Sequence, residues 1–175
     1  MSNDPDPAEQ YGGYAALTGS FLLATAGAVA GLERSGRLPR RVTPGDIALL
    51  GVATYQLSRT LTRDRVTAFL RAPFAEQREP AGRGEVESEA VGSGLRRTVG
   101  ELAICPFCMT QWVAAAGLVG LCAAPRWTRF AAGILAVRTV AEAVNLGHEA
   151  AVATIDRMDD VKTLTHERAE AATAA

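Results

Sequence analysis

The sequence predicts an all-α protein: a small multi-pass transmembrane helical bundle of three to four spans, with a C-terminal helical hairpin and a polar tail. Three observations predict this class. The apolar residues occur in uncharged blocks, the charged residues lie between those blocks, and the blocks are long enough for helices that cross a bilayer. Composition alone does not decide the class, because a hydrophobic share of 48% is close to the average of globular proteins.

The first predicted span covers residues 15–32, after a polar N-terminal tail over residues 1–14 that we expect to be disordered. These 18 residues carry no charge, which is just enough for a bilayer span. Ala28-Val29-Ala30 imitates a signal-peptide cleavage site. A signal peptide also needs a basic N-terminal region, and no Lys or Arg precedes this block, so we expect the segment to be retained.

The second predicted span covers residues 44–61 and is the weakest of the four by composition. Thr43 is expected to cap the helix and Pro44 to occupy its first turn. Arg59 would reach out to the membrane interface. A basic amphipathic stretch follows, either in the headgroup plane or packed on protein, and residues 75–94 then predict a flexible linker rich in Gly and Glu.

The third and fourth predicted spans cover residues 109–124 and 127–146. The connection between them is so short that they are expected to form an antiparallel helical hairpin. Together, residues 15–146 form the predicted membrane domain, and residues 147–175 form a polar helical C-terminal tail. With four spans, eleven basic residues lie on the side of both chain ends and six on the other, which favours an inner-membrane protein with both ends in the cytoplasm.

Two charges inside the fourth block need an explanation. Arg138 and Glu142 are spaced i, i+4, so they share a helix face and can neutralise each other. A charge at the centre of a spanning helix costs roughly 2.5–3.5 kcal/mol on insertion scales. The pair could be a polar feature of a bundle or subunit interface, or a couple that only assists packing. In a water-soluble four-helix bundle, the same pair would simply be exposed.

The motif Cys105-Pro106-Phe107-Cys108 opens the third span and allows three interpretations. It resembles the dithiol motif of glutaredoxins, although the surrounding sequence lacks the strands of that fold. It could provide part of a zinc site, since a hairpin would bring Cys105 and Cys108 near His148 and Glu149, with a second subunit completing the ligand set. The thiols could also simply seat the start of the helix.

Other functional classes find little support in the sequence. A net charge of −1 gives no general attraction to nucleic acid, and three cysteines are too few for a secreted disulfide scaffold. No catalytic triad, phosphate-binding loop, metalloprotease helix or pair of buried carboxylates is recognisable, so an enzymatic role is not predicted. The expected partners are the lipid bilayer and either further copies of the chain or another membrane protein. The alternatives are a membrane thiol or metal site and a soluble helical bundle that binds a partner helix.

Two motifs together resemble a known family. "LTRDRVTAFLRAPF", a variable linker, "GELAICPFCMTQWVAA" and "APRWTRFAA" are similar to the bacterial domain-of-unknown-function family 1360 over about residues 52–146. The resemblance implies a small multi-pass membrane protein, and some members carry a sporulation label, but it implies no reaction. Its motif positions correspond here to Asp64, Val66, Thr67, Arg71, Pro73, Phe74, Cys105, Pro106, Cys108 and Trp112. The resemblance places Asp64, Arg71 and the two thiols at one membrane face.

Overall fold

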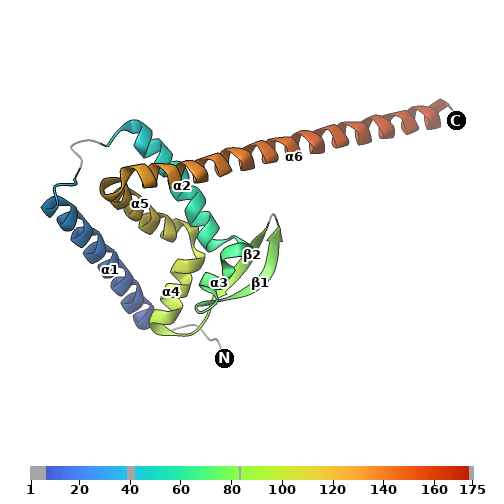
Figure 1. Cartoon of the computed structure of the whole chain (residues 1–175). Helices are drawn as coiled ribbons and strands as arrows, with labels where there is room; N and C mark the ends of the chain where they lie inside the picture. The colour runs from blue at the N-terminus through green and yellow to red at the C-terminus, as the bar shows by residue number, and fades with distance from the viewer. Residues whose placement is uncertain (1–6, 39–41, 83, 174–175) are drawn as a thin grey trace. The chain divides into compact units, whose positions relative to one another are not determined.

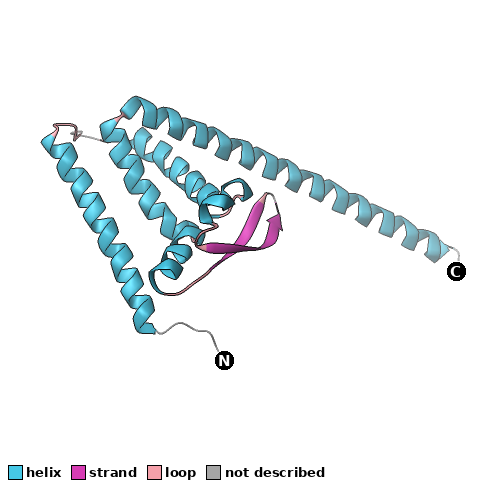
Figure 2. Cartoon of the chain, turned by 60° about the horizontal axis from the view of Figure 1, so that its bottom comes forward, coloured by secondary structure: helices cyan, strands magenta, loops and turns pink. Residues whose placement is uncertain are grey.

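The computed structural model describes residues 7–38, 42–82 and 84–173. The described chain is mostly helical, with one two-stranded sheet (Figure 2). It divides into two compact units, of which the first ends at Ala136 and the second begins at Val137. The predicted helical class is therefore correct, and the sheet is an addition to it.

Helix α1 spans Pro7–Arg34 and ends in a glycine cap. Gly36 adopts a φ of +66°, Gly36 N donates to Glu33 O at 3.0 Å, and Arg37 N donates to Leu32 O at 2.9 Å. These two bonds form a Schellman motif, which satisfies carbonyls that the helix leaves without partners. The helix begins earlier than expected, because residues 7–14 belong to it rather than to a disordered tail; residues 1–6 lie outside the described residues.

Helix α2 spans Pro44–Thr62, as the capping signals predict. The Thr43 side chain accepts a hydrogen bond from Asp46 N at 3.1 Å, and Pro44 occupies the first turn. The Asp46 carboxylate also forms a two-bond ion pair with Arg129. Arg129 Nε lies 2.7 Å from Asp46 Oδ1, and Arg129 Nη2 lies 3.1 Å from Oδ2. This pair ties the start of α2 to the first turns of helix α6, which spans Pro125–Thr173.

The segment after α2 contains the main departures from the predictions. The amphipathic stretch forms only a 3-10 turn over Arg65–Thr67 and the short helix α3 over Ala68–Arg71. The predicted flexible linker is instead an antiparallel hairpin of β1 (Ala75–Gly82) and β2 (Glu85–Ala90), drawn in magenta in Figure 2. Gly82 and Gly84 flank its turn at φ +82° and +78°, a conformation that glycine adopts without strain.

The hairpin was not predictable from strand propensity because its exposed side chains are charged. Arg78 on β1 and Glu89 on β2 form a cross-strand ion pair with Nη2 and Oε2 2.6 Å apart. The buried side chains of the hairpin are small or medium, namely Ala75, Val86 and Ala90. A pattern of this kind lacks the large β-branched and aromatic residues that mark most strands.

Two further helices follow the hairpin. Helix α4 spans Gly94–Ile104, where no separate helix was expected, and α5 spans Pro106–Ala123. Helix α6 then continues without a break through the fourth apolar block and the predicted tail. Within the first unit, α5 packs on α2 (Figure 1), a pairing that was not predicted; the hairpin with residues 127–146 involves both units and stays a prediction.

The pairing of α2 with α5 is antiparallel. A Cβ atom at Gly117, late in α5, would lie 3.4 Å from Leu50 Cδ2, early in α2. The small side chain at this position lets the two backbones approach closely, as small residues do between membrane helices. The glycine at this position therefore helps α5 to pack closely on α2.

The interior of the first unit is unusually polar. The largest side chains with less than 2% exposure are Gln56, Ser58 and Thr62, all on α2. Large apolar side chains lie outside instead, with Leu23 77% exposed and Phe130 66% exposed. Water-soluble proteins show the opposite distribution, since their buried positions are dominated by large apolar residues.

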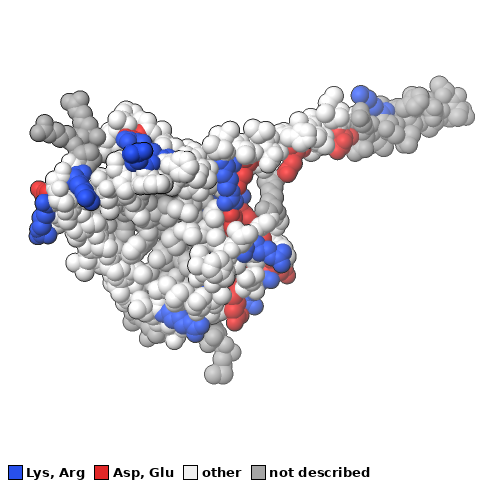
Figure 3. Space-filling model, viewed as in Figure 1, with Lys and Arg blue, Asp and Glu red and all other residues white. Residues whose placement is uncertain are grey.

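Three described helices are long and apolar enough to cross a membrane: Tyr11–Arg34, Pro106–Ala123 and Pro125–Met158. In each of them, only 6% of the apolar window is buried. Helix α2 is not among the three, although its length matches the predicted span. Figure 3 shows that charged side chains gather over the hairpin and near the ends of α1, leaving an uncharged surface between them.

Candidate functional site

The CPFC motif borders a cleft between α1, α4 and α5, which we call the thiol cleft. Its volume is about 420 Å³. Helix α1 provides one wall, and the last turns of α4 with the first turns of α5 provide the other. The lining residues are Tyr14, Leu17, Thr18, Phe21, Thr98, Glu101, Leu102, Cys105, Cys108, Gln111 and Trp112.

Cys105 caps the N-terminus of α5. Its backbone is extended (φ −97°, ψ 106°), and its Sγ accepts a hydrogen bond from Cys108 N at 3.2 Å. Pro106 occupies the first helical position, where a missing N–H costs nothing. The interpretation that the thiols serve the start of the helix thus corresponds here to an N-cap formed by Cys105. All three cysteines are free, with Cys105 half-buried and Cys108 exposed.

A carboxylate forms the polar end of the cleft. Tyr14 Oη donates to Glu101 Oε2 at 2.5 Å, and Arg97 Nε donates to Glu101 Oε1 at 3.2 Å. The close approach of α1 to α4 depends on Gly13, where a Cβ atom would lie 2.1 Å from Thr98 Oγ1. The glycine therefore sets the distance that allows the phenol to reach the carboxylate.

Two aromatic rings mark the opposite, apolar end. Phe21 of α1 and Trp112 of α5 meet edge to face, with ring centroids 5.2 Å apart and planes at 70°. Aromatic pairs of this geometry contribute about 0.5–1.5 kcal/mol beyond their buried area. Trp112, a motif position of unknown role in the sequence, thus fastens α1 to α5 at the cleft.

The other motif positions form a second cluster at the end of α2, which we call the helix-end cluster. The Arg71 guanidinium is 3% exposed. Its Nη1 donates to Leu61 O at 2.6 Å and to Thr67 Oγ1 at 3.1 Å, and its Nη2 donates to Asp64 O at 3.1 Å. Burial lowers the pKa of Arg71, and the nearby charge of Asp64 opposes that shift. Arg71 therefore satisfies Leu61 O, a carbonyl at the end of α2, and adds a donor to Asp64 O, which also accepts from the Thr67 hydroxyl at 3.0 Å.

Pro73 and Phe74 dock this cluster on α4. Pro73 O accepts hydrogen bonds from Arg96 Nε at 3.1 Å and Nη2 at 2.8 Å. Phe74 O accepts one from Val91 N at 2.9 Å. Asp64, Arg71, Pro73 and Phe74 therefore act within the fold through their own contacts, and the cluster is separate from the residues that line the thiol cleft.

The predicted metal ligands are divided between the two units. Cys105 and Cys108 belong to the first, and His148 lies exposed on α6 in the second. The prediction that brings them together depends on a hairpin of the third and fourth spans, whose second half lies in the second unit. Within the described ranges, no group of three His, Cys, Asp or Glu side chains is arranged to hold a metal ion. A zinc site therefore stays a prediction that requires further ligands.

Arg138 and Glu142 also lie in the second unit. Arg138 Nε donates to Glu142 Oε1 at 3.0 Å, with both side chains partly exposed. This contact has the geometry of a neutralising i, i+4 couple. Its two predicted roles, at a bundle or subunit interface or in packing alone, stay predictions.

Tyr14 and Glu101 are the cleft residues that sequence reasoning missed. They are 87 positions apart, so no local spacing connects them. The Gly12-Gly13 pair beside Tyr14 was the available signal, because glycine in an apolar helix favours close helix contact.

Comparisons with known proteins agree with the motifs. The model of a family described as "Protein of unknown function (DUF1360)" matches residues 49–148. Sporulation protein YjcA of Bacillus subtilis (strain 168) is 38% identical over 81 residues, which are 45% of this chain and 67% of that protein. No solved structure matches the chain. The matched range holds the helix-end cluster and the CPFC motif but excludes α1, which supplies one wall of the thiol cleft.

Proposed function

The chain belongs to the DUF1360 family of proteins of unknown function, and from its own geometry we propose that it is a multi-pass integral membrane protein with a structural or interaction role. The observation that carries this proposal is the inverted distribution of side chains. Gln56, Ser58 and Thr62 are buried, while long apolar helices are almost wholly exposed. Lipid or another membrane protein would cover such surfaces, because large contiguous apolar patches are rare on soluble monomers.

The arrangement of elements supports a bundle with one polar end. Between the end of α2 and the start of α5, the chain forms the helix-end cluster, the hairpin and α4. In our proposal these elements cap the bundle at the cytoplasmic face of the inner membrane, and α2 crosses the bilayer beside α5 with its polar side chains turned inward. The α2–α5 contact supports this crossing, because Leu50 lies near Gly117 at one end, and residues of both helices line one pocket at the other end.

The role as an interaction protein rests on how the motif side chains are engaged. Arg71 binds backbone carbonyls of its own chain, Arg96 binds Pro73 O, and Cys105 caps its own helix. These bonds hold the polar end in one conformation. The exposed outer faces of α1 and α6 are then the surfaces offered to lipid, to a second copy of the chain, or to another membrane protein.

Carbonate extraction and cysteine labelling test this proposal. Cys108 and Cys122 lie near opposite ends of α5, so single-cysteine variants that retain one or the other report on its two ends. We expect the protein to stay in carbonate-washed membranes. We also expect an impermeant maleimide on intact cells to label Cys122 and to reach Cys108 only after permeabilisation. Labelling of both from one side, or release into the carbonate wash, would contradict the proposal; release would favour a soluble bundle.

A second candidate function is a membrane thiol or metal site at the CPFC motif. It is favoured by the position of Cys108, which is exposed at a cleft that also holds the Glu101 carboxylate. Zinc content of the purified chain, compared with a Cys105→Ser variant, tests this candidate. Equal zinc in both proteins, together with slow alkylation of the thiols at neutral pH, would exclude it.

A further inference from the structure

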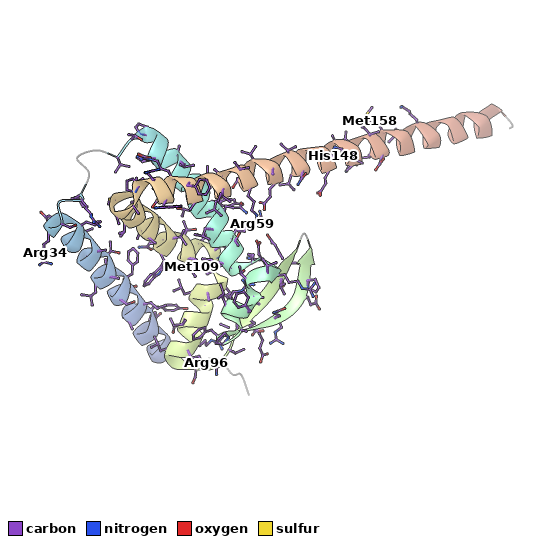
Figure 4. The ribbon with its side chains drawn as sticks, viewed as in Figure 1. Arg34, Arg59, Arg96, Met109, His148 and Met158 are labelled. Atoms are coloured by element: carbon purple, nitrogen blue, oxygen red, sulfur yellow. The ribbon has the colours of Figure 1, made fainter. Side chains whose placement is uncertain are left out.

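A second, smaller pocket lies on the other side of the α2–α5 contact. It has a volume of about 270 Å³ and lies between the last turns of α2 and the first turns of α5, with Glu85 of β2 at its edge. Figure 4 labels Arg59, which extends from α2 beside the hairpin in this region. We call this space the arginine pocket.

One side chain at the pocket has an unsatisfied polar atom. Ser58 is 1% exposed, and within the described part of the chain its Oγ has no hydrogen-bond partner. Buried hydroxyl groups are nearly always bonded to protein, ordered water or a ligand. The Thr110 hydroxyl also borders the pocket, but it already donates to Pro106 O at 2.7 Å. Ser58 is thus the buried hydroxyl at the pocket whose proton is available, whereas the Tyr55 side chain at the pocket is 56% exposed.

The charges around the pocket favour an anion. Arg59 and Arg63 lie one helical turn apart, and Arg59 Nη2 is 2.5 Å from Glu85 Oε1. Two guanidinium groups against this single lining carboxylate leave an excess of one positive charge. The N-terminus of α5 adds to it, because the N–H of Phe107 is in the first turn and has no carbonyl within the helix to bond.

The pocket also lies at the level where a bilayer would present its headgroups. Pro106, which begins a helix long enough to span, is one of its lining residues. Phe107 is 89% exposed and Tyr55 is 56% exposed beside it. Aromatic side chains are enriched at membrane–water interfaces, and guanidinium groups bind phosphate oxygens in a planar, two-bond geometry.

We propose that the arginine pocket binds a phosphate group, carried either by an anionic lipid headgroup or by a free phosphate, with Arg63 and the Ser58 hydroxyl as the donors. The lipid source rests on the proposed function, since only a membrane protein would hold this pocket at headgroup depth. Arg59 stays paired with Glu85, so its charge attracts the phosphate electrostatically but forms no new hydrogen bond with it. The size of the pocket suits a small polar group rather than a larger ligand.

The test uses the full chain purified in a neutral detergent. Native mass spectrometry and thermal unfolding would measure binding of phosphatidylglycerol, of diacylglycerol as a phosphate-free lipid, and of inorganic phosphate. We expect phosphatidylglycerol to be retained and to raise the melting temperature, and diacylglycerol to do neither. Arg63→Gln should weaken binding roughly tenfold, the loss expected for one charge-assisted contact. Arg65→Gln, at an exposed arginine that does not line the pocket, is the matched control.

Ser58→Ala keeps the test decisive if Arg63→Gln disturbs the fold. Removal of an unsatisfied hydroxyl should leave the ligand-free protein at least as stable, while its stabilisation by the ligand falls. Binding of inorganic phosphate but not of phosphatidylglycerol would support the site and identify the free ion as its source. Equal binding by wild type, Arg63→Gln and Ser58→Ala would overturn the proposal. Carbonate extraction tests membrane location separately, so each failure can be recognised by itself.

Discussion

Replacement of Arg71 by methionine should destabilise the protein, because the guanidinium satisfies the backbone carbonyl of Leu61 at the end of α2. Arg71→Met removes the donors to Leu61 O and Asp64 O at the end of α2. A buried acceptor that loses its donor costs about 1–3 kcal/mol, and this cost applies to Leu61 O, because Asp64 O keeps the Thr67 hydroxyl as a donor at 3.0 Å. Methionine also removes the cost of burying a charge, which offsets part of this loss.

The net expectation for Arg71→Met is a loss of about 1.5 kcal/mol, or roughly tenfold in the ratio of folded to unfolded protein. Arg71→Lys should lose less, since it keeps the charge but not the planar fork of donors. The assay is unfolding in mixed micelles of neutral detergent and SDS, followed by far-UV circular dichroism.

The matched control is Arg65→Met, at an exposed arginine six positions earlier. We expect it to change the free energy of unfolding by less than about 0.5 kcal/mol, as most surface substitutions do. If Arg71→Met and Arg65→Met lowered the stability equally, the carbonyl-capping role of Arg71 would be refuted.

Three further substitutions test other contacts by the same unfolding assay. Gly100→Ala should destabilise the protein, because its Cβ would lie 2.5 Å from the backbone oxygen of Phe74, which cannot move aside. Gly12→Ala meets no atom within 4 Å and should stabilise the helix by about 0.5–1 kcal/mol. A stabilising Gly100→Ala and a destabilising Gly12→Ala would contradict the packing described for these positions. Asp46→Asn should lower the stability, and a double-mutant cycle with Arg129→Gln should show positive coupling, with zero coupling counting against the ion pair. Cys105→Ala should cost about 0.5–2 kcal/mol and Cys105→Ser almost nothing, and equal losses would argue against the capping role.

Local signals predicted the helices that begin at recognisable caps. Thr43 and Pro44 mark the start of α2, and Pro106 marks the start of α5, so both helices begin within three residues of the expected positions. These predictions succeeded because capping involves neighbouring residues only. The packing of α5 on α2 was not predicted for the opposite reason, since contact between Leu50 and Gly117 depends on residues far apart in the chain.

The functional contacts were harder to foresee than the motifs that contain them. The sequence marks Asp64 and Arg71 as motif positions, but the acceptors of Arg71 are mainly backbone carbonyls, which every residue carries and no pattern reveals. The thiol cleft was foreseen only in part. Cys105 and Trp112 were candidates, whereas Tyr14 entered it through a helix contact that depends on the absence of a side chain at Gly13.

The ion pair between Asp46 and Arg129 has a consequence for biosynthesis. Its partners are separated by 83 positions, so Asp46 is translated well before the arginine that will neutralise it leaves the ribosome. Until then, the early end of α2 carries a negative charge without its arginine partner, and the ion pair can form only after the first turns of α6 have been made. A nascent chain arrested before residue 129 would therefore leave Asp46 accessible to solvent, and the ion pair between Asp46 and Arg129 would form after the arrest is released.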